Sequence, residues 1–383
     1  MIIKLGKVIS EYSVRNKADE DIPVYSVTND KGFCTNYFSK DVSSKDRTTY
    51  KIVPYGYFAY NPSRINVGSV DWQHYEKKVI VSPLYVVFYV DEVIDQRYLL
   101  HYLKSDITLK FIKSNSAGSV RDNLKLSVLQ EFSINLRTKE EQYKIVNILD
   151  KVDLLISLYA EKLKKFDDLT KSLFIEMFGD PVENPMNWDV KELGDYITVL
   201  TDFNSNGSYE LLDSNVVMKD EPDYAWIVRI TDLETMNEKG RKYIDEKTWN
   251  LLEKSKICGN EIIMCKIGSA GKIYIMPNTG KPASLGRNAF MFRFNELLER
   301  EYVYYLLNTD YGIKEITQYV RGAVTKTITK DDVRRLRVMV PPINEQKKFI
   351  SFINKIDKSK LAVKKSLEEL EILKKSLMQK YFA

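Results

Sequence analysis

Apolar side chains recur at alternating spacings of four and three residues along two segments of the chain. The first stripe runs from Ile145 to Met177 and the second from Phe349 to Tyr381. Only Thr170 in the first stripe, and Lys360 and Lys374 in the second, interrupt the pattern. An apolar stripe sustained over several heptads predicts a long helix that packs on another helix as a coiled coil. We therefore expect two long helices that pack on each other.

The two stripes belong to a sequence that is duplicated within the chain. KEEQYKIVNILDKVD at 139–153 returns as INEQKKFISFINKID at 343–357, an offset of 204 residues. The same offset, without a gap, relates residues 98–178 to residues 302–382. A repeated unit of this length is a tandem domain and not a solenoid repeat.

The match fades toward the start of each copy. Leu5-Gly6 corresponds to Leu193-Gly194 at an offset of 188 residues. We therefore expect the second copy to carry sixteen additional residues in its poorly matching front part.

Each copy has a front part of mixed α and β character, which makes the fold class α+β. Apolar and aromatic runs at 85–90 and 289–294 predict strands, and QRYLLHYLKS and REYVYYLLNT after them predict helices. Gly179-Asp180-Pro181 is a typical helix end, and Pro341-Pro342 stops a strand just before the second long helix. The expected order is a first domain at 1–137, a first long helix at 138–179, a linker at 180–187, a second domain at 188–342 and a second long helix at 343–383.

Composition and charge narrow the class of protein only a little. The 383 residues are 44% hydrophobic, which is enough to bury more than one core. A net charge of +5 permits nucleic-acid binding without requiring it, because the distribution of charge decides. From Ile343 onward ten lysines face five acidic residues, so the last helix carries an excess as large as that of the whole chain.

Cysteine and histidine usage gives no sign of a metal site or a disulfide framework. Cys34, Cys258 and Cys265 form no CxxC pair, and only His74 and His101 could join them. The first residues lack the apolar core of a signal peptide, and no apolar run is as long as a membrane span. We therefore expect a soluble cytoplasmic protein that binds no metal.

Four features together resemble the specificity subunit of type I restriction-modification systems over almost the whole length. They are the duplication, the two EQ-initiated helices, the junction FGDPVENPMNWDVKELGD at 178–195 and NPSRINVGS at 61–69. A glycine turn at Gly118 and Gly322 adds to the resemblance. No single feature is specific, but the combination is.

The resemblance implies a non-catalytic subunit with two target recognition domains, each reading one half of a bipartite, asymmetric site in double-stranded DNA. Its two long helices would run antiparallel, set the gap between the half-sites and dock two methyltransferase subunits, which restriction subunits would join. S-adenosylmethionine, ATP and magnesium would be bound by those partners and not by this chain. Because the sequence opens almost directly in its first domain, the last helix would have to pack with that domain.

Two other classes of protein remain as alternatives. One is a coiled-coil scaffold whose globular ends bind proteins without sequence-specific DNA binding. The other is an enzyme, but its signals are incomplete. NPSR at 61–64 lacks the second proline and the aromatic residue of the amino-methyltransferase motif. GSAGK at 268–272 lacks the glycine spacing of a phosphate loop and is followed by Ile273, where Ser or Thr is needed. We expect no catalytic residues.

DNA recognition needs cations for the phosphates and polar side chains for the base edges. Arginine reads guanine and asparagine reads adenine, each good pair contributing about 1–3 kcal/mol of discrimination. Glycine turns let the backbone approach a groove. These criteria select candidates in loops of both domains: Asn61, Ser63, Arg64, Asn66, Ser69, Ser116, Ser119 and Arg121 in the first, and Lys266, Ser269, Lys272, Arg287, Asn288, Arg321, Thr325 and Lys326 in the second.

Three leucines lie off the stripe of the first long helix. Leu154, Leu155 and Leu158 could widen the packed face of that helix. A helix of roughly 40 residues is on the order of 60 Å long, which is more than one partner helix and two end domains would cover. We therefore expect these leucines to contact the methyltransferase subunits.

Overall fold

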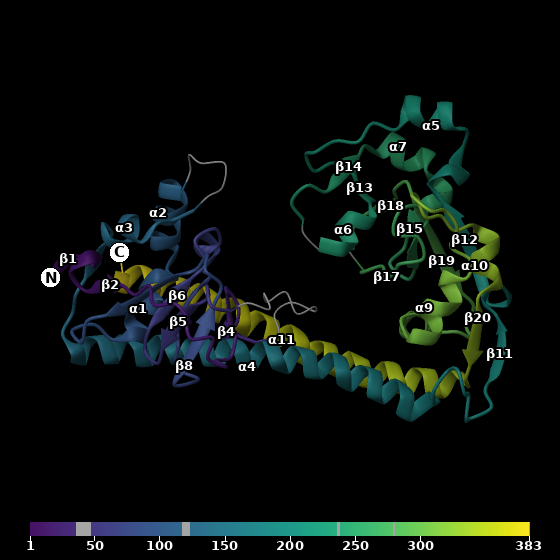
Figure 1. Ribbon diagram of the computed structural model, residues 1–383. Helices are drawn as coiled ribbons and strands as arrows, with labels where there is room; N and C mark the ends of the chain where they lie inside the picture. The colour runs from purple at the N-terminus through teal and green to yellow at the C-terminus, as the bar shows by residue number, and fades with distance from the viewer. Residues whose placement is uncertain (36–46, 117–122, 236–237, 279, 383) are drawn as a thin grey trace. The chain divides into compact units, whose positions relative to one another are not determined.

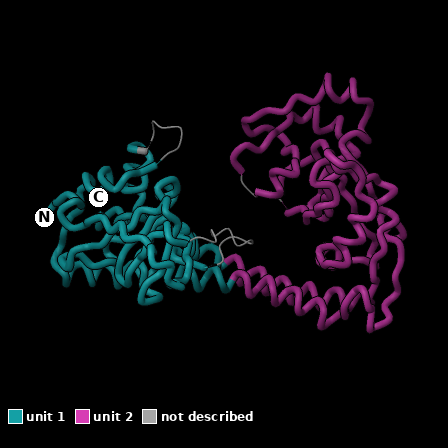
Figure 2. The backbone as a smooth tube through the Cα atoms, viewed as in Figure 1, with its two compact units in different colours: residues 1–162, 362–383 teal, residues 163–361 magenta. Residues whose placement is uncertain are grey.

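The computed structural model describes residues 1–35, 47–116, 123–235, 238–278 and 280–382. The chain forms two compact units (Figure 2). Unit 1 contains residues 1–162 and 362–383, and unit 2 contains residues 163–361. Each unit therefore consists of one globular part and portions of both long helices.

The two predicted long helices are α4 (Lys139–Phe178) and α11 (Ile343–Phe382) (Figure 1). In unit 1, Met378 and Phe382 of α11 share a core with residues near the start of α4. In unit 2, Phe349 near the start of α11 packs on Phe178 at the end of α4, with the ring centroids 5.4 Å apart. Within each unit the helices thus run in opposite directions, which confirms the antiparallel pair.

Every position of both heptad stripes is buried or half-buried. The two lysines that interrupt the second stripe make ion pairs across to α4. The Lys374 ammonium lies 2.5 Å from the Asp153 carboxylate within unit 1, and Lys360 lies 2.7 Å from Asp167 within unit 2. The apolar stems of these lysines continue the packed seam, and their charges are neutralised at its edge.

Unit 1 is built around a four-stranded antiparallel sheet in the order β2-β9-β6-β7. Two-stranded pairs β1-β10, β3-β4 and β5-β8 surround it. Its elements are β1 (Ile2–Lys4), β2 (Ile9–Glu11), β3 (Ser26–Thr28), β4 (Gly32–Cys34), β5 (Lys51–Pro54), β6 (Phe58–Tyr60), η2 (Ile65–Val67), β7 (Val70–Trp72), β8 (Lys78–Val81), β9 (Val86–Val90), α1 (Gln96–Leu103), α2 (Asp106–Ser116), α3 (Leu126–Gln130) and β10 (Ser133–Asn135).

Unit 2 has a four-stranded sheet in the order β12-β19-β16-β17 and a second sheet in the order β14-β13-β18-β15, with β11 paired to β20. Its elements are β11 (Asp189–Glu192), β12 (Ile197–Asp202), α5 (Tyr209–Asn215), β13 (Ala225–Val228), α6 (Ile230–Thr235), β14 (Lys242–Ile244), α7 (Glu246–Leu251), β15 (Lys256–Ile257), β16 (Ile262–Cys265), β17 (Ile273–Ile275), β18 (Ala283–Leu285), β19 (Ala289–Phe294), α8 (Arg300–Leu307), α9 (Asp310–Thr317), α10 (Lys330–Arg335) and β20 (Arg337–Val340).

The duplication read from the sequence is also a duplication of topology. Strands β2, β9, β6 and β7 occupy the same order in their sheet as β12, β19, β16 and β17. The offset of 204 residues already relates β6 to β16, whereas 188 relates β2 to β12. The additional residues of the second copy therefore lie between β12 and β16, where unit 2 builds its second sheet.

A buried glutamine fixes the start of each long helix to its own domain. Gln142 accepts a hydrogen bond from the Asp95 backbone N–H at 2.7 Å and donates to the carbonyls of Val93 and Arg137. In unit 2, Gln346 repeats these contacts. Both amides are fully buried, so the EQ motif is a joint between the helix and the turn that precedes α1 or α8.

Aromatic side chains anchor the far end of each long helix. Phe178 of α4 packs edge to face on Tyr302 of α8, with the centroids 4.9 Å apart. Phe382 of α11 packs on Tyr98 of α1 at 5.2 Å. The last helix therefore packs with the first domain, as expected. Gly179, at a φ of 79°, ends α4 in the left-handed conformation that the sequence predicted.

Candidate nucleic-acid interface

The candidate loop of the first domain, residues 61–69, connects β6 to β7. Its shape comes from local hydrogen bonds, because the Asn61 side-chain oxygen accepts from the Ser63 backbone N–H at 3.1 Å and from the Ser63 hydroxyl at 2.9 Å. The single turn η2 follows, anchored by the buried Ile65. Gly68 closes the turn at a φ of 90°, a conformation that favours glycine.

This loop borders a hollow of about 260 Å³ in unit 1. Asn61 and Arg64 line it together with the turn between β3 and β4 and with Tyr85. Arg64 and Ser63 are exposed, and Asn61 and Asn66 are half-buried. The loop thus brings an arginine and two asparagines together, the side chains that can read guanine and adenine.

Ser69, the last candidate of the loop, has a different position. Its side chain is buried, and its hydroxyl donates to the Val27 carbonyl of β3 at 2.6 Å. The hydroxyl therefore holds the loop against the neighbouring hairpin instead of facing solvent.

The other candidates of the first domain surround Gly118. Ser119 and Arg121 lie outside the described residues, and Ser116 is the last residue of α2. The chain returns beside the first loop, because the Leu124 backbone N–H donates to the Pro62 carbonyl at 3.1 Å. The Tyr60 hydroxyl also donates to the Leu124 carbonyl, at 3.0 Å.

In the second domain the structure brings three candidate loops together. The loop at 266–272 connects β16 to β17, the position that 61–69 occupies in unit 1. The Lys266 backbone N–H donates to the Asn288 carbonyl at 2.8 Å, and the Ile328 N–H donates to the Lys266 carbonyl at 3.2 Å. The Gly268 N–H donates to the Lys326 carbonyl at 2.9 Å. Residues separated by up to about sixty positions thus form one surface.

The lysines and arginines of this surface differ in how readily they could bind a phosphate. Lys266 and Lys330 both bind Asp202, at 2.9 and 2.8 Å. Burial raises the pKa of that carboxyl, but hydrogen bonds from Lys330, Ser205 and Lys266 outweigh it and lower the pKa to about 2. Because Asp202 is nearly buried, releasing Lys266 to a phosphate would leave a poorly solvated carboxylate.

Two other cations of the second domain make ion pairs that solvent reaches more easily. Lys272 lies 2.7 Å from Glu234, and Arg287 lies 3.1 Å from Asp213. Exposed ion pairs contribute little, so a DNA phosphate could replace these carboxylates at small cost. Arg321 is two thirds exposed, but its partner Asp332, 2.9 Å away, is only 3% exposed, so moving Arg321 to a phosphate would leave a poorly solvated carboxylate.

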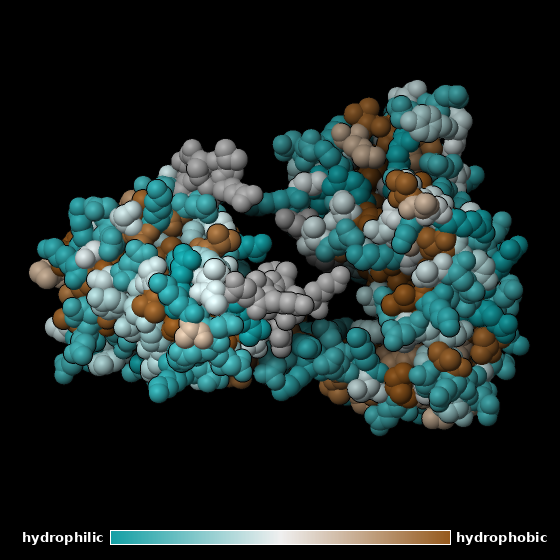
Figure 3. Space-filling model, viewed as in Figure 1, coloured by the Kyte–Doolittle hydropathy of each residue, from teal (hydrophilic) through white to brown (hydrophobic). Residues whose placement is uncertain are grey.

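The remaining candidates of the second domain lie on its surface. Ser269, Thr325 and Lys326 are exposed, and Asn288 is exposed with a φ of 66°. Figure 3 shows mainly hydrophilic colours on the visible face, with apolar patches scattered among them.

The sequence did not point to several residues that line these surfaces. Asn29, in the turn between β3 and β4, borders the hollow beside Asn61. Asp202 and Lys330 hold the second surface together. A turn signal marks Asn29 in the sequence, but only the fold places these residues beside the candidates.

The two histidines lie outside these loops. Among the described residues, no His, Cys, Asp and Glu side chains are grouped so that they could hold a metal ion, and none of the helices has the length and hydropathy of a membrane span. His101 binds Asp150 at 2.8 Å, a hydrogen bond that lowers the pKa of that carboxyl, and Arg97 binds the other oxygen at 3.1 Å. His74 stacks on Trp72.

Similarity to known proteins agrees with this architecture. The family model of the type I restriction modification DNA specificity domain matches twice, at residues 2–166 and 185–372. The specificity subunit of the type I restriction enzyme MjaVIII of Methanocaldococcus jannaschii is 23% identical over 325 residues, which cover 79% of this chain and 73% of that protein.

Two solved structures share the fold along the whole chain. The S subunit of a type I restriction-modification system from M. genitalium has a TM-score of 0.59 at 16% identity, covering 100% of this chain and 96% of that one. A chain from a structure of a type I R-M system has a TM-score of 0.57 at 17% identity, covering 100% and 97%. The chain belongs to the family of type I restriction-modification DNA specificity proteins.

Proposed function

We propose that this chain is the DNA-recognition subunit of a type I restriction-modification complex. The observation that carries the proposal is the repeated interface. A candidate loop connects β6 to β7 in unit 1, and another connects β16 to β17 in unit 2, at equivalent positions of two sheets with the same strand order. Two equivalent DNA-reading loops in one chain are compatible with a DNA site that has two halves. Because the side chains of the two loops differ, the two halves would differ in sequence.

The domains at 1–137 and 188–342 would each read one half-site. In the first, Arg64 and Asn66 offer donors and acceptors that distinguish bases in the major groove, and Asn61 offers its amide N–H groups, because its oxygen already accepts two hydrogen bonds from Ser63. In the second, Arg321 and Lys326 are exposed cations beside the loop at 266–272. Phosphate contacts would supply most of the affinity, and base contacts the choice of sequence.

Catalysis belongs, in this proposal, to other subunits. Two methyltransferase subunits would bind S-adenosylmethionine, and restriction subunits would use ATP and magnesium in the cytoplasm. Leu154, Leu155 and Leu158 on α4 are 58%, 41% and 49% exposed, which makes them available for docking a methyltransferase subunit. The purified chain, incubated with DNA and S-adenosylmethionine, should give no methylation.

DNA binding by the chain reconstituted with its methyltransferase subunits tests the proposal. We expect the association constant for a duplex carrying the target to fall steeply as salt rises, because phosphate contacts release counterions. Arg64→Ala should weaken binding to the target by about 1–3 kcal/mol and relax the sequence preference at one position. A scaffold that binds only proteins would show neither effect, and that result would refute the proposal.

A further inference from the structure

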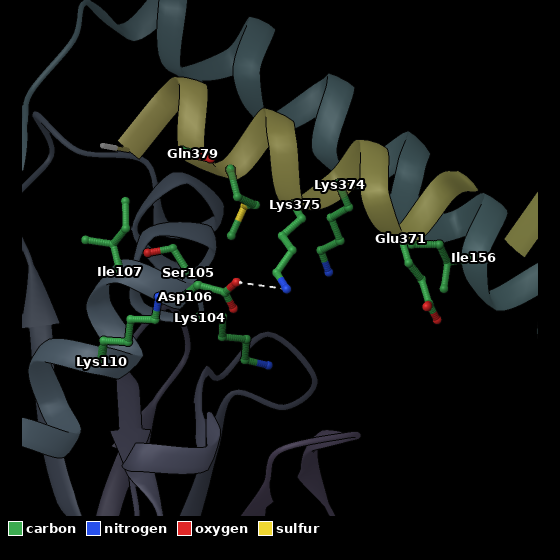
Figure 4. A pocket seen from close by; sticks show the side chains of 11 residues that line it. Lys104, Ser105, Asp106, Ile107, Lys110, Ile156, Glu371, Lys374, Lys375 and Gln379 are labelled. Atoms are coloured by element: carbon green, nitrogen blue, oxygen red, sulfur yellow. Dashed lines mark ion pairs between the residues drawn. The ribbon is translucent and has the colours of Figure 1, made fainter. Parts of the chain in front are cut away.

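A second polar hollow in unit 1 has a lining distinct from that of the hollow beside the loop at 61–69. It has a volume of about 640 Å³ and lies between α11 and the segment that joins α1 to α2 (Figure 4). Four lysines line it, Lys104 and Lys110 from one side and Lys374 and Lys375 from α11. Only two carboxylates, Asp106 and Glu371, accompany them in the lining.

We call this hollow the lysine pocket, after Lys104, Lys110, Lys374 and Lys375. Nearby carboxylates neutralise the charges of these lysines only in part. Lys374 pairs with Asp153, and Lys375 lies 3.7 Å from Asp106 in an exposed, loose contact. Lys104 is half-buried, and no ion pair joins it to another residue of the described part of the chain. Burial lowers the pKa of Lys104, the more distant carboxylates of Asp71, Asp153 and Asp30 oppose that effect, and the positive charge of Lys374 adds to it. A half-buried ammonium that makes no direct ion pair is costly, so an anion here would be stabilised.

The equivalent place in unit 2 shows that the pocket is not a general property of the repeat. Asn308 and Thr170 stand there in place of Lys104 and Lys374. Tyr311 stands in place of Ile107 and packs on the core of unit 2. In place of Ile156 and Glu371, unit 2 has Lys360 and Asp167, which bind each other at 2.7 Å. The four-lysine lining is therefore specific to the first copy.

The position of α2 favours nucleic acid as the occupant. This helix packs on η2, the turn of the loop at 61–69, and its first residues border the lysine pocket. The same helix thus supports a base-reading loop and a cluster of cations. We propose that the lysine pocket holds phosphodiester groups of the duplex beside the half-site read by the first domain, an inference that rests on the proposed function.

The contact would be independent of sequence, because lysine recognises phosphate as a point charge. The contact would also be made beside one half-site, that of the first domain, because the equivalent place in unit 2 lacks two of the four lysines. The phosphate contacts of the two domains would then contribute unequally to affinity, whatever bases each domain reads.

The double variant Lys104→Asn with Lys374→Thr tests the inference, because it installs the residues that unit 2 carries at these places. The matched control, Lys171→Gln with Lys314→Gln, removes the same charge from exposed positions of unit 2 that correspond to Lys375 and Lys110. Fluorescence anisotropy with a labelled 40-base-pair duplex would be measured from 50 to 300 mM NaCl, using each protein in complex with the methyltransferase subunits. Equal thermal midpoints would show that both variants fold.

We expect the slope of log K against log salt to become shallower by about 0.9–1.8 for the test variant, on target and non-target duplexes alike. Each lost phosphate contact contributes about 0.9, and Lys374 contributes less than a full contact because it shares its charge with Asp153. The control should keep the wild-type slope. Equal slopes for the test variant and wild type, or equal losses in both variants, would overturn the inference. A wild-type complex that binds no DNA would instead refute the proposed function.

Two other occupants give distinct results, each of which overturns the inference. If the pocket received an acidic surface of a methyltransferase subunit, the test variant would lose that subunit in size-exclusion chromatography. If it received a free nucleotide, ATP would raise the thermal midpoint of the wild type but not of the test variant, and the DNA slope would not change.

Discussion

The buried glutamine at the start of each long helix allows a sharp test of how the helices are joined to their domains. Gln142→Leu keeps the approximate size of the side chain and removes its three hydrogen bonds. The Asp95 N–H and the carbonyls of Val93 and Arg137 would then lose their partner. At about 1 kcal/mol for each net hydrogen bond, the joint would be weakened by about 3 kcal/mol, and more if the freed groups stay dry.

Native-state hydrogen exchange measures this loss where it occurs. A weakening of about 3 kcal/mol corresponds to exchange on the order of 100-fold faster in peptides around Asp95 and the start of α4. Peptides around Gln346 in unit 2 should keep their protection, and Gln346→Leu should reverse the pattern. Gln379→Leu, at an exposed position of α11, is the control and should change neither. If Gln142→Leu changed exchange near Asp95 by less than about threefold, the joint would not depend on the amide.

Two further perturbations test the packing and the charges of the domains. Asp202→Asn should destabilise the protein at pH 5, because a carboxyl whose folded pKa is about 2 stabilises the fold above its unfolded pKa of about 3.9. The difference in thermal midpoint from wild type should shrink as the pH falls from 4 to 2, and a difference independent of pH would contradict the pairing with Lys266 and Lys330. Phe178→Ala should cost about 3–5 kcal/mol in urea unfolding, because the ring is fully buried. Phe382→Ala should cost less, because that ring is 8% exposed, and a larger cost for Phe382→Ala would contradict this explanation.

The long helices and the duplication could be predicted because both leave periodic signals in the sequence. The heptad stripes match the positions that the structure buries, and the offset of 204 residues relates the helix bounds in both copies. The candidate loops were expected at equivalent places of the two domains, but the strands β6 and β16 that precede them escaped prediction because they have only three and four residues. So short an apolar run is compatible with several alignments.

Glycines and polar side chains in the sequence were enough to predict the candidate loops. The residues that surround these loops in the fold could not be predicted. Ser69 looks like a solvated loop residue in the sequence, yet β3 covers it. Lys266 looks like a free cation, yet its partner Asp202 lies 64 positions earlier. Such pairings depend on which strands become neighbours, which local sequence does not specify.

Exchange of the first domain tests the central claim most directly. Residues 1–137 would be replaced by the corresponding domain of another specificity subunit, and the methylated sites of a host carrying the complete system would be mapped by methylome sequencing. We predict that one half-site changes while the other half-site and the gap between them persist. Persistence of both half-sites, or a simultaneous change in both, would contradict the view that each domain reads its own half.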